Sequence, residues 1–172
     1  MKTCAIVGCH PTRFKFKYKE THMGCKRLKK RLKEQFIKQH EQGVHTFLIG
    51  GSLGVDIWSG EILLTMRKDP EYSDIHLIVV IPFEGHDNTW DEHNKTRLAF
   101  LKAHAEVVVV SREPEPASYY KQSQYLLNCA DCLIAVFDMD YTVRSHVGRI
   151  VSKAARQKIP VAYIHPDTGK VT

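Results

Sequence analysis

Three segments of the chain are apolar almost throughout, and they restrict the possible fold more than any other feature. They are residues 75–81 (IHLIVVI), 106–110 (EVVVV) and 131–137 (DCLIAVF). A strand with one face in water alternates apolar and polar residues, whereas a strand covered on both faces need not. The three segments therefore predict strands of a parallel sheet that is buried on both faces.

Helical patterns alternate with these and other strand-like segments. In residues 25–39, Leu28, Leu32 and Phe36 recur at a spacing of four, as on one face of a helix. Strands are expected at residues 2–8, 46–49, 75–81, 106–110, 131–137 and 160–164, and helices at 25–39, from about 54 to before Pro70, 90–103, 118–129 and 145–157. Regular alternation predicts an α/β fold, a Rossmann-like three-layer sandwich with a mostly parallel sheet of about six strands. Residues 1–172 are expected to form a single domain of this kind.

Composition limits the class of protein. The chain has 172 residues, 43% hydrophobic and 26% charged, which is typical of a globular domain and not of a disordered one. No apolar run approaches the roughly 20 residues that span a bilayer, and the N-terminus reads as a strand and not as a signal peptide. Five cysteines, an odd number, favour reduced thiols and a cytoplasmic location. The formal net charge of +6 permits an anionic ligand.

The strongest local signal is the sequence IGGSLGVDIWSGE at residues 49–61, where a strand runs into glycines and then into a helix. Glycines allow conformations and close approaches that a Cβ atom blocks. The amides at the helix start, with the helix dipole behind them, favour a phosphate. The ligand-binding residues expected here are Gly50, Gly51, Ser52, Leu53, Gly54 and Asp56. The alternative is a tight turn that binds nothing.

Two acidic residues of this helix are the candidates for acid–base catalysis. Asp56 would repel a bound phosphate, so it either caps the helix or accepts hydrogen bonds from a ribose hydroxyl or an amine. Glu61 lies about two helical turns beyond Gly54, on roughly the same face as the turn. It either points along the cleft or is a solvated surface residue.

Other expected ligand-binding residues follow the ends of the first, third and fifth strands, because ligands of open α/β sheets sit beyond these ends. They are Gly8, Cys9, His10 and Arg13; Pro82, Phe83 and Trp90; and Asp138, Thr142, Arg144 and Ser145. Arg13 and Arg144 could hold an anion, and Phe83 or Trp90 could stack on a base or simply pack. Ser145 also suits a helix N-cap.

Metal and nucleic-acid binding are less strongly indicated. Cys129 and Cys132 form a CxxC pair with no further ligands at metal spacing, so neither a metal nor a cofactor is predicted. The run from Phe14 to Lys19 interleaves aromatic residues with lysines ahead of a basic helix, as single-strand binders do, or as a solvated face would. Nucleic acid therefore stays open as a partner, as does a second copy of the chain; a membrane is not expected.

The motifs together resemble one known family. They are Gly50-x-x-Leu53-Gly54-Val55-Asp56-x-Trp58-x-x-Glu61, Gly8-x-x-Pro11, the Ile81-Pro82 turn with Trp90, and Asp131-x-Leu133-Ile134-Ala135-Val136-x-Asp138. In this order they resemble the YpsA-like proteins of the SLOG superfamily, which also contains the LOG phosphoribohydrolases and the DNA-processing protein DprA. The resemblance implies a Rossmann-like fold and a nucleotide or nucleotide-derived ligand. It implies no settled reaction, since YpsA-like members are mostly inferred ligand binders or sensors.

The chain departs from the family pattern at three places. Gly8-Cys9-His10-Pro11 replaces a Gly-His-Arg-Pro opening, and residues 140–144 replace a Gly-Gly-Thr turn. The catalytic glutamate of LOG enzymes corresponds here to Ile57 or Trp58, and Glu61 lies one turn too far. The first hypothesis is therefore a nucleotide-binding sensor. The alternatives are a hydrolase of the N-glycosidic bond of nucleoside 5′-monophosphates and a DprA-like nucleic-acid binder.

Overall fold

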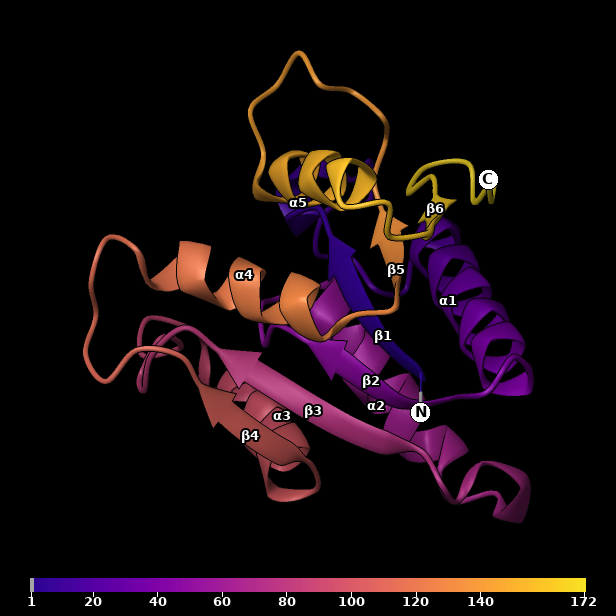
Figure 1. The fold of residues 1–172 in the computed structure, drawn as a ribbon, viewed down its shortest axis with the longest axis horizontal. Helices are drawn as coiled ribbons and strands as arrows, with labels where there is room; N and C mark the ends of the chain where they lie inside the picture. Colours follow the sequence, from indigo (N-terminus) through magenta and orange to yellow (C-terminus); the bar gives the residue numbers. More distant parts are fainter. Residues whose placement is uncertain (1) are drawn as a thin grey trace.

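The computed structural model describes residues 2–172, and a single six-stranded sheet forms its centre (Figure 1). The strands are β1 (Lys2–Gly8), β2 (Val44–Ile49), β3 (His76–Ile81), β4 (Glu106–Val109), β5 (Cys132–Val136) and β6 (Val161–Ile164). Their order across the sheet is β4-β3-β2-β1-β5-β6, and every neighbouring pair is parallel. The predicted α/β fold is confirmed.

Five helices cover the sheet in two layers. They are α1 (Met23–Glu41), α2 (Val55–Met66), α3 (Glu92–Ala103), α4 (Ser118–Cys129) and α5 (His146–Arg156), with short 3-10 turns η1 (Pro11–Arg13) and η2 (Pro70–Tyr72). On one face α2 contacts both α1 and α3, and on the other face α4 contacts α5 (Figure 1). This is the three-layer sandwich that the sequence predicts.

One strand differs from the expectation of burial on both faces. Strand β4 has no fully buried residue, and Val109 is exposed. The reason is its position: β4 lies at the edge of the sheet and pairs only with β3. An apolar run thus identified the strand but not its place in the sheet.

Strand order creates a crevice between β1 and β5. From β1 the chain proceeds to β2, β3 and β4 on one side, whereas after β5 it continues to β6 on the other. Loops that leave β1 and β5 therefore diverge to opposite faces, and ligands of open α/β sheets bind where they part.

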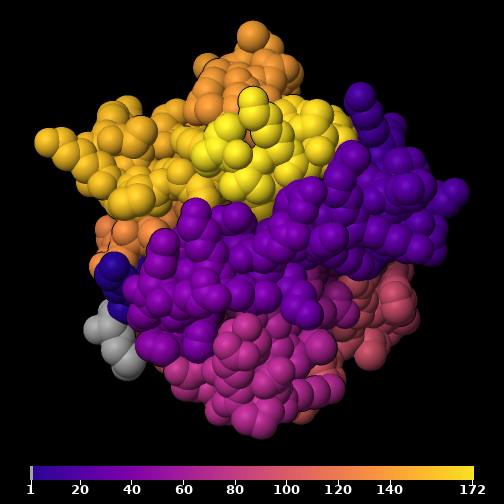
Figure 2. Space-filling model, turned by 90° about the vertical axis from the view of Figure 1, so that its right-hand side faces the viewer, coloured from indigo at the N-terminus to yellow at the C-terminus, as the bar shows by residue number. Residues whose placement is uncertain are grey.

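Helix α1 crosses the face shown in Figure 2, between the C-terminal segment and the segment around residues 65–75. The Arg27 guanidinium donates a hydrogen bond to the carbonyl of Asp167. This contact joins α1 to the C-terminal segment beyond β6.

Helices α2 and α3 approach each other closely at Gly60. A Cβ atom there would lie 2.7 Å from Cδ1 of Leu101, a distance that real Cβ contacts do not show. We expect Gly60→Ala to destabilise the fold by about 1 kcal/mol, because overpacking costs about 1–3 kcal/mol and removing a helix glycine returns roughly 1 kcal/mol. In a Leu101→Ala background the same methyl group enters a cavity, so it should stabilise by about 1 kcal/mol. Urea unfolding of the four proteins measures both values, and an equal effect in both backgrounds would contradict this packing.

Candidate functional site

A small pocket of about 200 Å³ lies at the crevice, and it joins segments that are far apart in the chain. Gly8 ends β1 and His10 lies in the loop that follows, while Ser52, Leu53, Val55 and Asp56 belong to the glycine turn and the start of α2. The opposite wall consists of Tyr119, Gln122 and Leu126 of α4 and His146, Val147 and Ile150 of α5. The predicted first and second loops therefore meet, and α4 and α5 complete the enclosure.

Backbone conformation explains two glycines of the turn. Gly51 has a φ of 72° and Gly54 a φ of 87°, values that favour glycine. A Cβ atom on Gly54 would also lie 2.6 Å from Cγ of Pro11. The backbone of the turn thus favours glycine at both positions, and the contact with Pro11 of η1 requires glycine at Gly54 as well.

Side chains from two other elements hold the carbonyl groups of the turn. The buried amide of Gln122 donates to the carbonyls of Gly50 and Val80, the latter at 2.8 Å. The Nε2 atom of His86 lies 2.9 Å from the carbonyl oxygen of Gly51. These contacts fix the peptide planes of the turn before any ligand arrives.

The amides of the turn are only partly free. The Ser52 amide donates to Oδ2 of Asp56 at 3.0 Å, so it is not the bare donor that the sequence predicts. Gly54 is the N-cap of α2 and provides no side-chain cap. Within residues 2–172, the amides of Val55, Asp56 and Ile57 have no hydrogen-bond acceptor. The first turn of α2 thus keeps unpaired donors, while Asp56 already occupies one donor of the preceding turn.

Burial raises the pKa of Asp56 to about 6, although hydrogen bonds from the Ser52 and Gly50 amides oppose this shift. A carboxyl group with such a pKa changes its charge just below neutral pH. The alternative that Asp56 caps α2 is not what the structure shows, because α2 has no side-chain cap and Asp56 instead accepts the Ser52 amide of the preceding turn.

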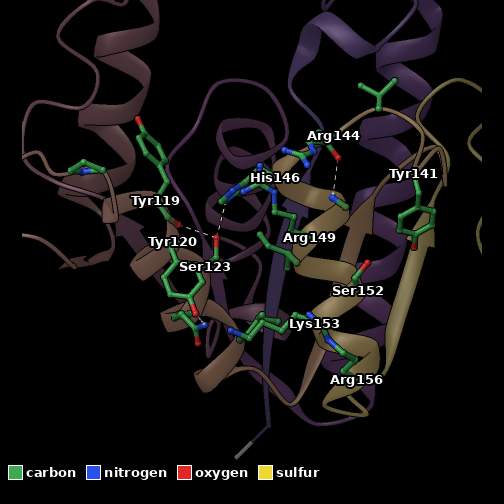
Figure 3. A pocket seen from close by; sticks show the side chains of 17 residues that line it. Tyr119, Tyr120, Ser123, Tyr141, Arg144, His146, Arg149, Ser152, Lys153 and Arg156 are labelled. Carbon is green, nitrogen blue, oxygen red and sulfur yellow. Dashed lines mark hydrogen bonds between the residues drawn. The ribbon is translucent and has the colours of Figure 1, made fainter.

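A larger groove of about 770 Å³ adjoins this pocket, with which it shares Tyr119, His146 and Ile150 (Figure 3). Tyr119, Tyr120 and Ser123 of α4 form one wall. Along the other wall and the loop before α5 lie Arg144, Arg149, Lys153 and Arg156. The volume lies within the range of small-molecule sites.

The charges of the groove are of one sign. Its lining holds the four cations just named and no Asp or Glu, as far as residues 2–172 are concerned. The Lys153 ammonium lies 5.2 Å from the centre of the Tyr120 ring, and Nε2 of His146 lies 2.9 Å from Oγ of Ser123. Cations beside exposed tyrosine rings suit a ligand that carries both phosphate and an aromatic base.

Comparisons with known proteins agree with the motifs. The family model YpsA, described as the YspA SLOG family, matches residues 4–168. The chain belongs to the YpsA family of SLOG proteins. A UPF0398 protein of Bacillus cereus is 31% identical over 141 residues, which cover 80% of this chain and 75% of the relative. A UPF0398 protein of Bacillus thuringiensis is 27% identical over 168 residues, 96% of this chain and 88% of the relative.

The YpsA signature ends at Glu61, and the structure places this residue away from the crevice. Its carboxylate pairs with the Arg97 guanidinium of α3, which also binds Glu20 at 2.7 Å. Burial alone would raise the pKa of Glu20, but Arg97 and Lys29 together lower it to about 2. Of the two alternatives for Glu61, the position along the cleft is therefore excluded, because α3 provides a cation on the side of α2 that Glu61 faces.

Two predicted residues of the crevice neutralise each other. Arg13 binds both carboxylate oxygens of Asp138 at 2.8 Å. Cys9 is buried, and burial raises the pKa of its thiol to about 11, which opposes a nucleophilic role. Of the loop after β5, Arg144 and Ser145 line the groove, while the Thr142 amide donates to Asp140. Ser145 is also the N-cap of α5.

The aromatic residues after β3 support the site from outside. The Phe83 ring packs edge-on against Tyr119 with 6.1 Å between centres, and Trp90 packs against His86 at 5.6 Å. Neither they nor Pro82 line the pocket or the groove. Their contacts favour packing over base stacking.

Two of the three aromatic residues in the interleaved segment belong to the core, while Tyr18 is exposed. Phe14 and Phe16 are buried, and both rings lie 6.1 Å from the Trp58 ring. Phe14 and Phe16 are therefore not free to stack on nucleic-acid bases, because alternation in this segment turns the phenylalanines inward and the lysines outward.

The sequence interpretation missed the groove residues of α4 and α5. A usable signal existed, since Arg149, Lys153 and Arg156 recur at spacings of four and three and so share one face of α5. Tyr119 and Tyr120 gave no signal, because two exposed tyrosines at a helix start are ordinary.

Of the helices in residues 2–172, none is long and apolar enough to cross a membrane.

The pKa of Asp56 leads to a stability test. Its folded pKa of about 6 lies above its ordinary value, so the proton favours the native state and stability is lost as the pH rises toward 6. Between pH 5 and pH 7 the wild type should lose about 1 kcal/mol more than Asp56→Asn, which cannot ionise. Urea unfolding at the two pH values measures this difference.

Asp91, the N-cap of α3, offers a matched control. The Asn94 amide lowers the pKa of Asp91, so this residue stays ionised over the whole range and Asp91→Asn should follow the wild type. An equal fall for wild type and Asp56→Asn would show that Asp56 is already ionised at pH 5.

Proposed function

We propose that the protein binds a nucleotide or nucleotide derivative, with phosphate held by the cations of the groove and the base against its tyrosines. The observation that carries this proposal is the groove itself, in which Arg144, Arg149, Lys153 and Arg156 face α4 without a lining carboxylate. Membership of a SLOG family supports the same ligand class.

The adjoining pocket extends the proposed site. Its unpaired α2 amides and the start of α5, where Gly148 donates to the Ser145 hydroxyl, both lie at helix N-termini. Two converging N-termini favour negative charge by their dipoles. An extended ligand such as ADP-ribose can occupy groove and pocket together, which a single phosphate cannot. This supports a nucleotide derivative over inorganic phosphate.

Titration calorimetry tests binding with AMP, cyclic AMP, ADP-ribose and inorganic phosphate. We expect Arg149→Ala to weaken the binding of phosphate-containing ligands about tenfold or more, since a charge-assisted hydrogen bond contributes about 1.5–3 kcal/mol. Tyr119→Ala should weaken the binding of the nucleotides at least about fivefold, because about 1–3 kcal/mol of stacking is lost. The affinity for inorganic phosphate should stay unchanged.

Arg31 of α1, which pairs with Glu34 at 2.9 Å outside the groove, provides the matched arginine control. Arg31→Ala should bind like the wild type. Equal affinities of Arg149→Ala and Arg31→Ala, or no measurable binding of any compound, would reject the groove as the site.

A second candidate is hydrolysis of the N-glycosidic bond of a nucleoside monophosphate, favoured by the raised pKa of Asp56 inside the pocket. In this reaction water adds to the sugar carbon as its bond to the base nitrogen breaks, and the base leaves with a proton. Asp56→Asn should then abolish release of free base, measured by chromatography, while nucleotide binding persists. Absence of base release from the wild type would leave binding as the function.

A further inference from the structure

Three metal-ligating side chains converge where strands β2 and β3 begin, at the end of the sheet opposite the crevice. His40 lies in the last turn of α1, His45 near the start of β2, and Asp74 just before β3. Nε2 of His40 is 2.8 Å from Oδ1 of Asp74, and Nδ1 of His45 is 2.6 Å from Oδ2. All three ligand atoms lie within 4.8 Å of one another.

The cluster is enclosed but reachable. The two imidazole rings pack edge to face with 5.1 Å between centres, and Tyr72 packs at the same distance against His40. The side chain of His40 is 13% exposed and that of Asp74 52% exposed, so an ion could enter from the Asp74 side. The segment that contains η2 lies against α1 in Figure 2, which brings Asp74 to the end of that helix.

Hydrogen bonding does not account for all three groups. His40 is satisfied by its bond to Asp74. Among residues 2–172, the Nδ1 atom of His45 is buried and has no hydrogen-bond partner, although Oδ2 of Asp74 lies 2.6 Å away as an ion-pair partner. An unpartnered buried nitrogen costs free energy, and a metal ion would supply the missing partner.

We propose that His40, His45 and Asp74 bind a divalent transition-metal ion, with Zn²⁺ as the best chemical match and water as the fourth ligand. Two imidazoles and one carboxylate suit zinc, whereas Mg²⁺ and Ca²⁺ prefer oxygen ligands throughout. A tetrahedron with zinc bonds of about 2.0–2.2 Å has edges of about 3.4 Å. The contacts of 2.8 and 2.6 Å therefore need to lengthen by less than about 1 Å, and ligand atoms as far apart as 4.8 Å need to approach by about 1.4 Å.

The bound ion would join three segments of the fold. It would connect the end of α1 and the start of β2 to the segment that leads from η2 into β3. Since an unfolded chain does not present the three ligands together, the ion stabilises the native state.

Metal titration of the chain, purified without a polyhistidine tag and stripped with chelator, tests the site. We expect one Co²⁺ per chain, with the visible absorption of a four-coordinate ion, displacement by Zn²⁺, and a higher melting temperature with Zn²⁺. His45→Ala and Asp74→Asn should each weaken Zn²⁺ binding at least about tenfold, since loss of even a hydrogen-bond partner of a ligand lowers metal affinity about 10–100-fold.

The exposed His76–Glu106 pair, with 2.7 Å between Nε2 and Oε2, is the matched control because it offers only two ligands. His76→Ala should bind Zn²⁺ like the wild type. If His45→Ala fails to fold, Asp74→Asn decides, because its side chain is half exposed and its amide oxygen can still accept from His40. Unchanged binding in Asp74→Asn, loss of binding in His76→Ala, or no saturable binding to the wild type would overturn the proposal.

Discussion

Gly8 at the end of β1 lies so close to α2 that a Cβ atom there would come within 2.4 Å of Cγ2 of Val55. The crevice depends on this approach, because it sets how near the first turn of α2 comes to the end of the central strand. Val55 is branched at Cβ and buried, so it cannot turn aside at low cost. Pro11 against Gly54 makes a second contact of the same kind.

The charged groups at the crevice are partly neutralised by other groups of the protein. Asp138 neutralises Arg13, and the carboxylate of Asp56 accepts the Ser52 amide, so the innermost donors are partly occupied by the protein itself. As far as residues 2–172 are concerned, the groove lining offers no such carboxylate to the cations of α5. Positive charge without a lining carboxylate therefore lies along α5, away from the glycine turn that the motif emphasises.

Expectations from sequence succeeded where one element decides the outcome, and failed where a neighbour does. The apolar runs located β3, β4 and β5 because a short, nearly continuous apolar run is itself typical of a strand in a parallel sheet. The same runs could not place β4 at the edge, since strand order depends on connections that span the whole fold. Helix geometry left open whether Glu61 points along the cleft or is a solvated surface residue, and only the position of Arg97 on α3 shows that it faces away from the cleft.

The sequence by itself determined the alternation of strands and helices, the glycine turn and membership of the YpsA family, because each depends on short motifs whose residues are close together in the chain. Only the tertiary structure brought α4 and α5 together into a groove and His40, His45 and Asp74 into a cluster. These sites combine residues separated by tens of positions, and their proximity results from how helices pack on the sheet. Local pattern carries no record of such packing, since the same exposed tyrosine, arginine or histidine suits any solvated surface.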